Sequence, residues 1–158
     1  MTATAAFPPI AELVPHGGPM RLLHRVVSHR GATTVCAVDP AGSRLLSGGR
    51  DRVPVWVGVE YMAQCIAVHG GLVARERGET PRPGILLGSR RVRFGARHFE
   101  AGRELRVTAH LHRGERKLVV FDCEVGDADG GPPLATGRLN VYIVESWQDL
   151  TSGGPHEA

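Results

Sequence analysis

The chain has 158 residues, 42% of them hydrophobic and 22% charged, and a formal net charge of +3. These values are typical of a soluble globular protein with one domain, and no apolar run reaches the length of about eighteen residues that a membrane span needs. The start of the chain contains prolines and no basic region, so no signal peptide is expected. The three cysteines are far apart in apolar surroundings, which excludes a zinc or disulfide framework and predicts a cytoplasmic protein with buried thiols.

Two strands are predicted before the central helix, over residues 22–28 and 33–38, because both segments are apolar and contain β-branched side chains. Residues 1–9 precede them and are expected to be flexible. The segment 15–20, PHGGPM, is predicted to be a loop because it holds two prolines and two glycines. Residues 40–52 carry no sustained apolar pattern, and a long loop is expected there.

Residues 55–76 form the one long run with helical periodicity, and the run is apolar nearly all round, which predicts a buried helix. Two polar side chains interrupt it, Glu60 and Gln64. Because they are one helical turn apart, they lie on the same face. Glu60 falls in the first turn, near the positive end of the helix dipole and the unpaired backbone N–H groups. It is therefore the strongest chemical signal in the sequence.

A break at residues 77–84, RGETPRPG, ends the helix. The strands predicted after it cover residues 85–94, 105–111, 118–125 and 134–144, with a turn at 114–115. The tail over residues 146–158 is expected to be flexible. The folded domain is accordingly predicted to span residues 10–145.

This order of elements predicts an α+β fold in which a curved antiparallel sheet of five or six strands wraps around one long central helix. One helix cannot cover such a sheet by itself. The uncovered sheet edge and helix flank would be completed by a second copy, so we expect a dimer.

Arginines gather after the helix, at Arg90, Arg91, Arg93 and Arg97. Such a cluster is either an ordinary solvated face or a docking patch for an acidic partner. Nucleic acid is not expected as the partner, because few aromatic residues interleave with the arginines and no recognition motif is present.

Three blocks of the sequence resemble the hotdog-fold 3-hydroxyacyl-acyl-carrier-protein dehydratases, the FabA/FabZ-like group. VGVEYMAQ (57–64) resembles the family's helix, VPHGGPMRLLHRVV (14–27) its N-terminal segment, and GILLGSRRVRF (84–94) followed by EAGREL (100–105) its next strand. The set PH-x-x-P-M, W-x-G-x-E-x-M-A-Q and L-L-G-x-R is similar to the divergent ApeP-like subgroup of aryl-polyene gene clusters.

The resemblance implies elimination of water from a 3-hydroxyacyl thioester, with no metal or cofactor. That reaction needs a base for the proton next to the carbonyl, an acid for the departing hydroxyl and a donor for the thioester oxygen. Glu60 would be the acid or the acid/base, and His16 is the candidate base. The implied substrate-binding residues are Val57 and Gly58 through their backbone N–H groups, Gln64, Leu87 and Gly88.

The implied carrier-docking residues are Arg90, Arg91 and Arg93, which would meet an acyl carrier protein or coenzyme A. One feature departs from the family. Its catalytic histidine lies on the loop before the helix, whereas residues 43–52 contain no histidine.

Three functions are therefore kept open. The first is a homodimeric 3-hydroxyacyl-acyl-carrier-protein dehydratase of fatty-acid or aryl-polyene biosynthesis. The second is a non-catalytic acyl-binding subunit, or the partner of a histidine-bearing hotdog subunit in a heterodimer. The third is an acyl thioesterase in which Glu60 would activate water.

Overall fold

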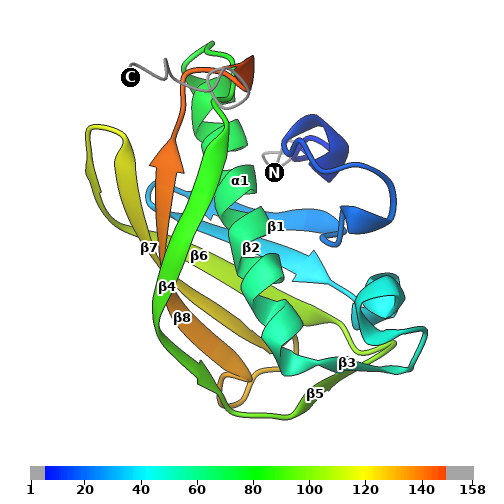
Figure 1. Ribbon diagram of the computed structural model, residues 1–158. Coiled ribbons are helices and arrows are strands. Elements are labelled where there is room, and N and C mark those ends of the chain that lie inside the picture. The colour runs from blue at the N-terminus through cyan, green and yellow to red at the C-terminus, as the bar shows by residue number, and fades with distance from the viewer. Residues whose placement is uncertain (1–5, 149–158) are drawn as a thin grey trace, which may run out of the picture.

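A six-stranded antiparallel sheet packs against one long helix, α1 (Gly58–Glu76), in the computed structural model of the protein, which describes residues 6–148 (Figure 1). The strands of this sheet are, in spatial order, β1 (Arg25–Arg30), β2 (Thr33–Val38), β6 (Leu105–Glu115), β7 (Leu118–Asp127), β8 (Ala135–Ile143) and β4 (Gly84–Phe94). A small second sheet pairs β3 (Arg52–Pro54) with β5 (His98–Glu100). The α+β architecture predicted from the sequence, one central helix with a curved antiparallel sheet, is confirmed.

Two details of the strand path correct the sequence-based predictions. β4 does not begin a simple meander: it lies at the far edge of the sheet and pairs with β8, because the intervening helix carries the chain across the sheet. The predicted turn at residues 114–115 is also wrong. β6 and β7 stay paired as far as Glu115 opposite Leu118, so the turn falls at 116–117, where Arg116 adopts a positive φ of 52°.

The segment predicted to be a long loop, residues 40–52, contains a 3-10 helix at Pro40–Ser47. The Asp39 side chain caps this helix by accepting a hydrogen bond of 2.8 Å from the backbone N–H of Ala41. Asp39 is a favourable capping residue because its carboxylate satisfies an N–H that the helix leaves unpaired. The remaining short 3-10 helices are Ile10–Glu12, Gly18–Met20 and Val55–Val57.

α1 is the core helix of the domain and contacts β2, β6 and β7. Tyr61, Met62, Cys65 and Val68 on this helix are fully buried. Together with the preceding 3-10 turn, the run Val55–Glu76 is long and apolar enough to cross a membrane by composition, yet 67% of that apolar window is buried inside the protein. Its apolar character is therefore explained by the core that surrounds it.

β1 and β4 form the two edges of the main sheet. β4 exposes apolar side chains along its length, including Leu87 at 60% and Phe94 at 46%. An edge strand offers unpaired backbone groups to another chain, and exposed apolar side chains beside it favour such pairing.

Most of the two ends predicted to be flexible, residues 1–5 and 149–158, lies outside the described residues. Between them, Phe7 is half-buried and packs against the core. The packed part of the chain thus begins before residue 10.

His69 lies on the side of α1 opposite to Glu60 and is 5% exposed. Its Nδ1 is 2.9 Å from the hydroxyl oxygen of Thr34, and its ring packs edge-on against Phe121. Burial, together with the neighbouring His29 and His110, lowers the pKa of His69 to about 4. His69 is therefore a neutral core residue near pH 7.

We expect two neighbouring glycines of α1 to respond oppositely to alanine. A Cβ at Gly71 would lie 2.6 Å from the backbone oxygen of Leu13, whereas a Cβ at Gly70 would meet nothing within 4 Å. Gly71→Ala should lower the free energy of unfolding by about 1–3 kcal/mol through overpacking. Gly70→Ala should raise it by up to about 1 kcal/mol because alanine favours the helix. Urea denaturation measures both, and equal midpoints would contradict the close packing of Leu13 on α1.

The His69 environment predicts a loss of stability in acid. The folded-state pKa of about 4 lies below the ordinary value of 6.5. Between these pH values His69 is therefore protonated in the unfolded chain and neutral in the folded chain. This contribution is complete above about pH 6.5 and disappears as the pH falls toward 4, by up to about 3 kcal/mol in total. His69→Leu should flatten the pH dependence of the unfolding free energy over that range. A variant curve parallel to that of the unaltered protein would refute the assignment.

Candidate active site

A cavity of about 790 Å³ lies along one side of α1. One face of the helix lines it together with the N-terminal segment and the start of β4, through residues 12–16, Glu60, Ala63, Ile66, Ala67, Gly70, 81–84, Leu86, Val141, Ile143 and Trp147. Most of these side chains are apolar. The cavity therefore suits an apolar ligand that meets a few polar groups.

Glu60 and His16 meet at this cavity. The Nε2 atom of His16 lies 3.5 Å from Oε1 of Glu60, and the two side chains are 31% and 36% exposed. The sequence predicts a carboxylate in a buried helix, whereas the Glu60 side chain remains partly exposed because it faces the cavity. Its place in the first turn of α1 is as predicted. The pair brings two groups capable of proton transfer to one end of an apolar groove.

The other nitrogen of His16, Nδ1, is buried and has no hydrogen-bond partner within the described residues. A buried polar atom without a partner is uncommon and costs free energy. Among the described residues, no hydrogen bond to Nδ1 therefore fixes which His16 nitrogen carries the proton.

Gln64 links the helix to the loop that carries His16. Its Nε2 donates a hydrogen bond of 2.8 Å to Oε1 of Glu60 and one of 2.7 Å to the backbone oxygen of Met20. Its Oε1 accepts one of 3.0 Å from the backbone N–H of Leu22. Gln64 is fully buried and does not line the cavity. It contacts Glu60 as expected, but direct binding of substrate is not supported.

The sequence predicts that Val57 and Gly58 present backbone N–H groups to a thioester oxygen, and neither residue lines the cavity. Val57 is buried and lies in the 3-10 turn that precedes α1. The N–H of Gly58 already donates to the oxygen of Val55, and a Cβ at Gly58 would lie 3.0 Å from the Phe99 ring. Gly58 therefore permits close packing inside the core, away from the cavity.

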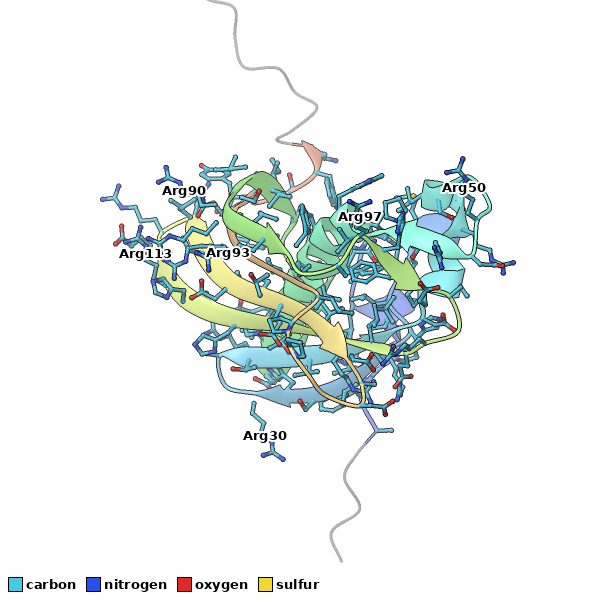
Figure 2. All side chains as sticks on the ribbon, turned by 90° about the horizontal axis from the view of Figure 1, so that it is seen from below. Arg30, Arg50, Arg90, Arg93, Arg97 and Arg113 are labelled. Carbon is cyan, nitrogen blue, oxygen red and sulfur yellow. The ribbon has the colours of Figure 1, made fainter. Side chains whose placement is uncertain are left out.

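The remaining predicted residues lie on β4 but do not line the cavity. Leu87 is largely exposed at the sheet edge, and Gly88 follows it. Arg90 and Arg93 lie farther along the strand, near the end of the molecule where α1 begins (Figures 1 and 2). Arg91 sits in the irregularity between them with a φ of 55°.

The sequence reasoning missed part of the cavity wall. Ala63 and Ala67 follow Glu60 at helical spacing, and such small residues on a helix predicted to be buried are the signal that could have indicated a cavity beside it.

The segment in which the family's loop histidine would be sought contains Ser43 instead. Ser43 is buried, and its hydroxyl oxygen lies 2.7 Å from that of Tyr61. Burial raises the pKa of Tyr61 to about 12, so this pair is neutral near pH 7. Within residues 6–148, no three His, Cys, Asp or Glu side chains are arranged to hold a metal ion.

The sequence matches the model of the family described as ApeP-like, ApeP dehydratase, over residues 8–152. The chain belongs to the ApeP-like dehydratase family. The match includes both the loop that carries His16 and the helix that carries Glu60. Family membership confirms the resemblance read from the sequence and shows that the function is dehydratase-like.

Solved structures support the same assignment. The dehydratase heterocomplex ApeI:P from Xenorhabdus doucetiae aligns with this ApeP-like chain at 30% identity and a TM-score of 0.80, covering 93% of this chain and 99% of that one. Two thioesterase structures align over 76% of this chain. The hypothetical thioesterase with coenzyme A from Streptococcus pneumoniae TIGR4 is 15% identical over 84% of its own length, with a TM-score of 0.56. Thioesterase superfamily member 2 of zebra fish is 16% identical over 80%, with a TM-score of 0.58.

At such low identity the two thioesterases show a shared hotdog fold alone. No curated protein matches the sequence significantly. The predicted hotdog fold is thus confirmed, and the dehydratase assignment rests on the ApeP-like family match and the heterocomplex.

Proposed function

We propose that the protein is a cytoplasmic subunit of a 3-hydroxyacyl-[acyl-carrier-protein] dehydratase of fatty-acid or aryl-polyene biosynthesis, with Glu60 and His16 as its catalytic residues. The observation that carries the proposal is the approach of His16 Nε2 to within 3.5 Å of Glu60 Oε1 at the end of an apolar cavity. A thioester placed there would have its reacting carbons beside both groups and its acyl chain along α1.

The proposed elimination uses the two groups in sequence. His16 Nε2 takes the proton next to the thioester carbonyl, and the electron pair of that C–H bond becomes the new double bond. Glu60 gives a proton to the hydroxyl group, which leaves as water. Because both side chains are partly exposed, His16 can then release its proton to water and Glu60 can take one up, so both groups are restored. No external oxidant or cofactor enters this balance.

The cavity supports an acyl substrate. Its helical floor runs from Glu60 to Gly70, a rise of about 15 Å along the helix axis. Between these ends the floor carries Ala63 and Ala67, whose small side chains leave room for a chain lying against the helix. The apolar lining favours burial of methylene groups.

We further propose that another hotdog subunit completes the enzyme. The ApeI:P structure is that of a heterocomplex, and this chain offers the β4 edge with exposed Leu87 and Phe94. A second hotdog chain could also supply the histidine that is missing from residues 43–52. The alternative is pairing of two identical copies, which a size measurement of the active species distinguishes from a heterodimer.

Arg90, Arg91 and Arg93 are proposed to meet the acidic carrier protein or the phosphates of coenzyme A. In the described part of the chain no ion pair occupies Arg90, Arg93 or the nearby Arg97. Figure 2 shows Arg90 and Arg93 on a side of the molecule away from Arg30. Unpaired arginines raise the encounter rate with an acidic partner.

The central prediction concerns Glu60. Glu60→Gln keeps the shape of the side chain but removes the acid, so kcat for dehydration should fall by about 10²- to 10⁴-fold. His16→Ala should cause a loss of the same kind. Glu76→Gln, at the other end of the same helix, and His98→Ala, on β5, should leave kcat nearly unchanged. The assay follows loss of water from a 3-hydroxyacyl thioester, with this chain alone and with candidate hotdog partners.

The same assay separates the alternatives. Hydrolysis of a saturated acyl thioester that requires Glu60 would indicate a thioesterase. Dehydration that requires a second hotdog subunit but survives Glu60→Gln would show that this chain is a non-catalytic partner. Size measurement of the active species distinguishes a homodimer from a heterodimer.

Reversal of the charge at the proposed docking face should affect carrier-bound substrate selectively. The double change Arg90→Glu and Arg93→Glu should raise KM for the acyl-carrier-protein substrate by about 10-fold or more at low salt, with a smaller effect at high salt. Turnover of a short thioester without a carrier should be unaffected. Arg30→Glu is the matched control, because Arg30 is an exposed arginine on β1, at the opposite edge of the sheet from β4. Equal effects of Arg30→Glu and the double variant would refute a defined docking face.

A further inference from the structure

Gln64 is a fully buried polar side chain of α1 next to the proposed catalytic pair. Its three hydrogen bonds determine the orientation of its amide. The backbone N–H of Leu22 can only donate, so it requires the amide oxygen, and the backbone oxygen of Met20 can only accept, so it requires the amide nitrogen. A flipped amide would place its NH₂ group against the N–H of Leu22 and its oxygen against the oxygen of Met20, so both hydrogen bonds would be lost. The NH₂ group therefore always faces Glu60.

This orientation differentiates the two oxygens of Glu60. Oε1 accepts the Gln64 hydrogen bond of 2.8 Å. No hydrogen bond within the described residues reaches Oε2. His16 Nε2 also approaches Oε1. Oε2 is thereby left as the oxygen that can exchange a proton with a ligand.

The same amide also anchors the loop before β1. Met20 and Leu22 directly follow the segment that carries His16, and the loop's own backbone bonds are long, with 3.3 Å from Met20 N to the oxygen of Gly17 and 3.2 Å from Arg21 N to that of Gly18. The shorter bond from Gln64 to Met20 ties this loop to α1. One side chain thus sets both the rotation of Glu60 and the position of the loop that brings His16 to it.

The geometry points to Gln64 as a positioning residue that makes Oε2 of Glu60 the proton-exchanging atom and holds the His16 loop against α1. This inference rests on the proposed dehydratase function of the same site. Gln64 does not touch the substrate, and it acts through Glu60 and His16. If Gln64 were only structural, its hydrogen bonds to the backbones of Met20 and Leu22 would stabilise the fold, and their loss would not change kcat.

The kinetic test is a double-variant cycle in the assembled enzyme, with a 3-hydroxyacyl thioester as the probe. Gln64→Met keeps the side-chain length but removes its hydrogen bonds, and it should lower kcat by about 10- to 100-fold with KM little changed. Combined with Glu60→Gln it should cause a clearly smaller loss than in the unaltered background, because the part of its effect that passes through Glu60 is already removed. The same fold loss in both backgrounds, or an unchanged kcat, would overturn the inference.

Two further variants guard against a folding effect. Ser43→Ala removes another buried side-chain hydrogen bond, that to Tyr61, and should lower stability without affecting kcat. Gln64→Glu keeps an acceptor for the Leu22 N–H but loses the donor to Glu60, so it should be as slow as Gln64→Met. A Gln64→Glu enzyme with normal kcat would overturn the inference.

A crystal structure of the Gln64→Met protein tests the geometry without reference to activity. We expect the His16 Nε2–Glu60 Oε1 distance to exceed the 3.5 Å of the unaltered chain and the loop to move. An unchanged pair would refute positioning by Gln64. If no subunit combination dehydrates the thioester, the proposed function fails, while this structural result still decides the role of Gln64.

Discussion

The rotation of α1 about its own axis is the constraint on which the candidate site depends. Tyr61, Met62, Cys65 and Val68 are fully buried, and they pack α1 against β2, β6 and β7. Successive residues of a helix are about 100° apart, so the apolar residues that lock the helix also fix the direction of Glu60. The carboxylate points to the cavity because the core leaves α1 no other rotation. The chemistry of the site thus begins with ordinary hydrophobic packing.

The loop before β1 is positioned differently, by polar contacts. Its buried anchors, Val14 and Leu22, lie at its two ends, and Gly17 to Pro19 between them are exposed. Near the exposed part it is held by a buried amide whose hydrogen-bonding groups are satisfied by backbone atoms and by Glu60. Buried polar networks of this kind are strongly directional, because an unmade bond inside a protein costs more than a made one contributes. Packing turns Glu60 toward the cavity, and the hydrogen bonds of Gln64 then hold both the Glu60 carboxylate and the loop that carries His16.

The sequence predicted the helix and the sheet well because both depend on periodic burial, which is visible along the chain. Prediction from the sequence failed where contacts between segments far apart in the chain determine the local structure. β3 and β5 are short, and they form because they pair with each other, which neither segment reveals alone. Gly58 resembled a ligand-binding glycine, whereas it is needed for the Phe99 ring that packs over it. The proximity of His16 to Glu60 came from a resemblance, since no local pattern joins residues so far apart in the chain.

The exposure of the pair argues for the role of a second subunit. Proton transfer from a carboxyl group to a leaving hydroxyl is most effective where water is excluded and the surrounding dipoles are fixed. In this chain Glu60 and His16 remain 36% and 31% exposed, and His16 Nδ1 has no partner among the described residues. A chain that paired at the β4 edge would lie beside the cavity wall formed by the start of that same strand, residues Gly84 and Leu86. The proposed assembly would therefore cover the open side of the cavity and pair the free edge of the sheet at the same time. Formation of the oligomer would then also exclude water from the catalytic pair.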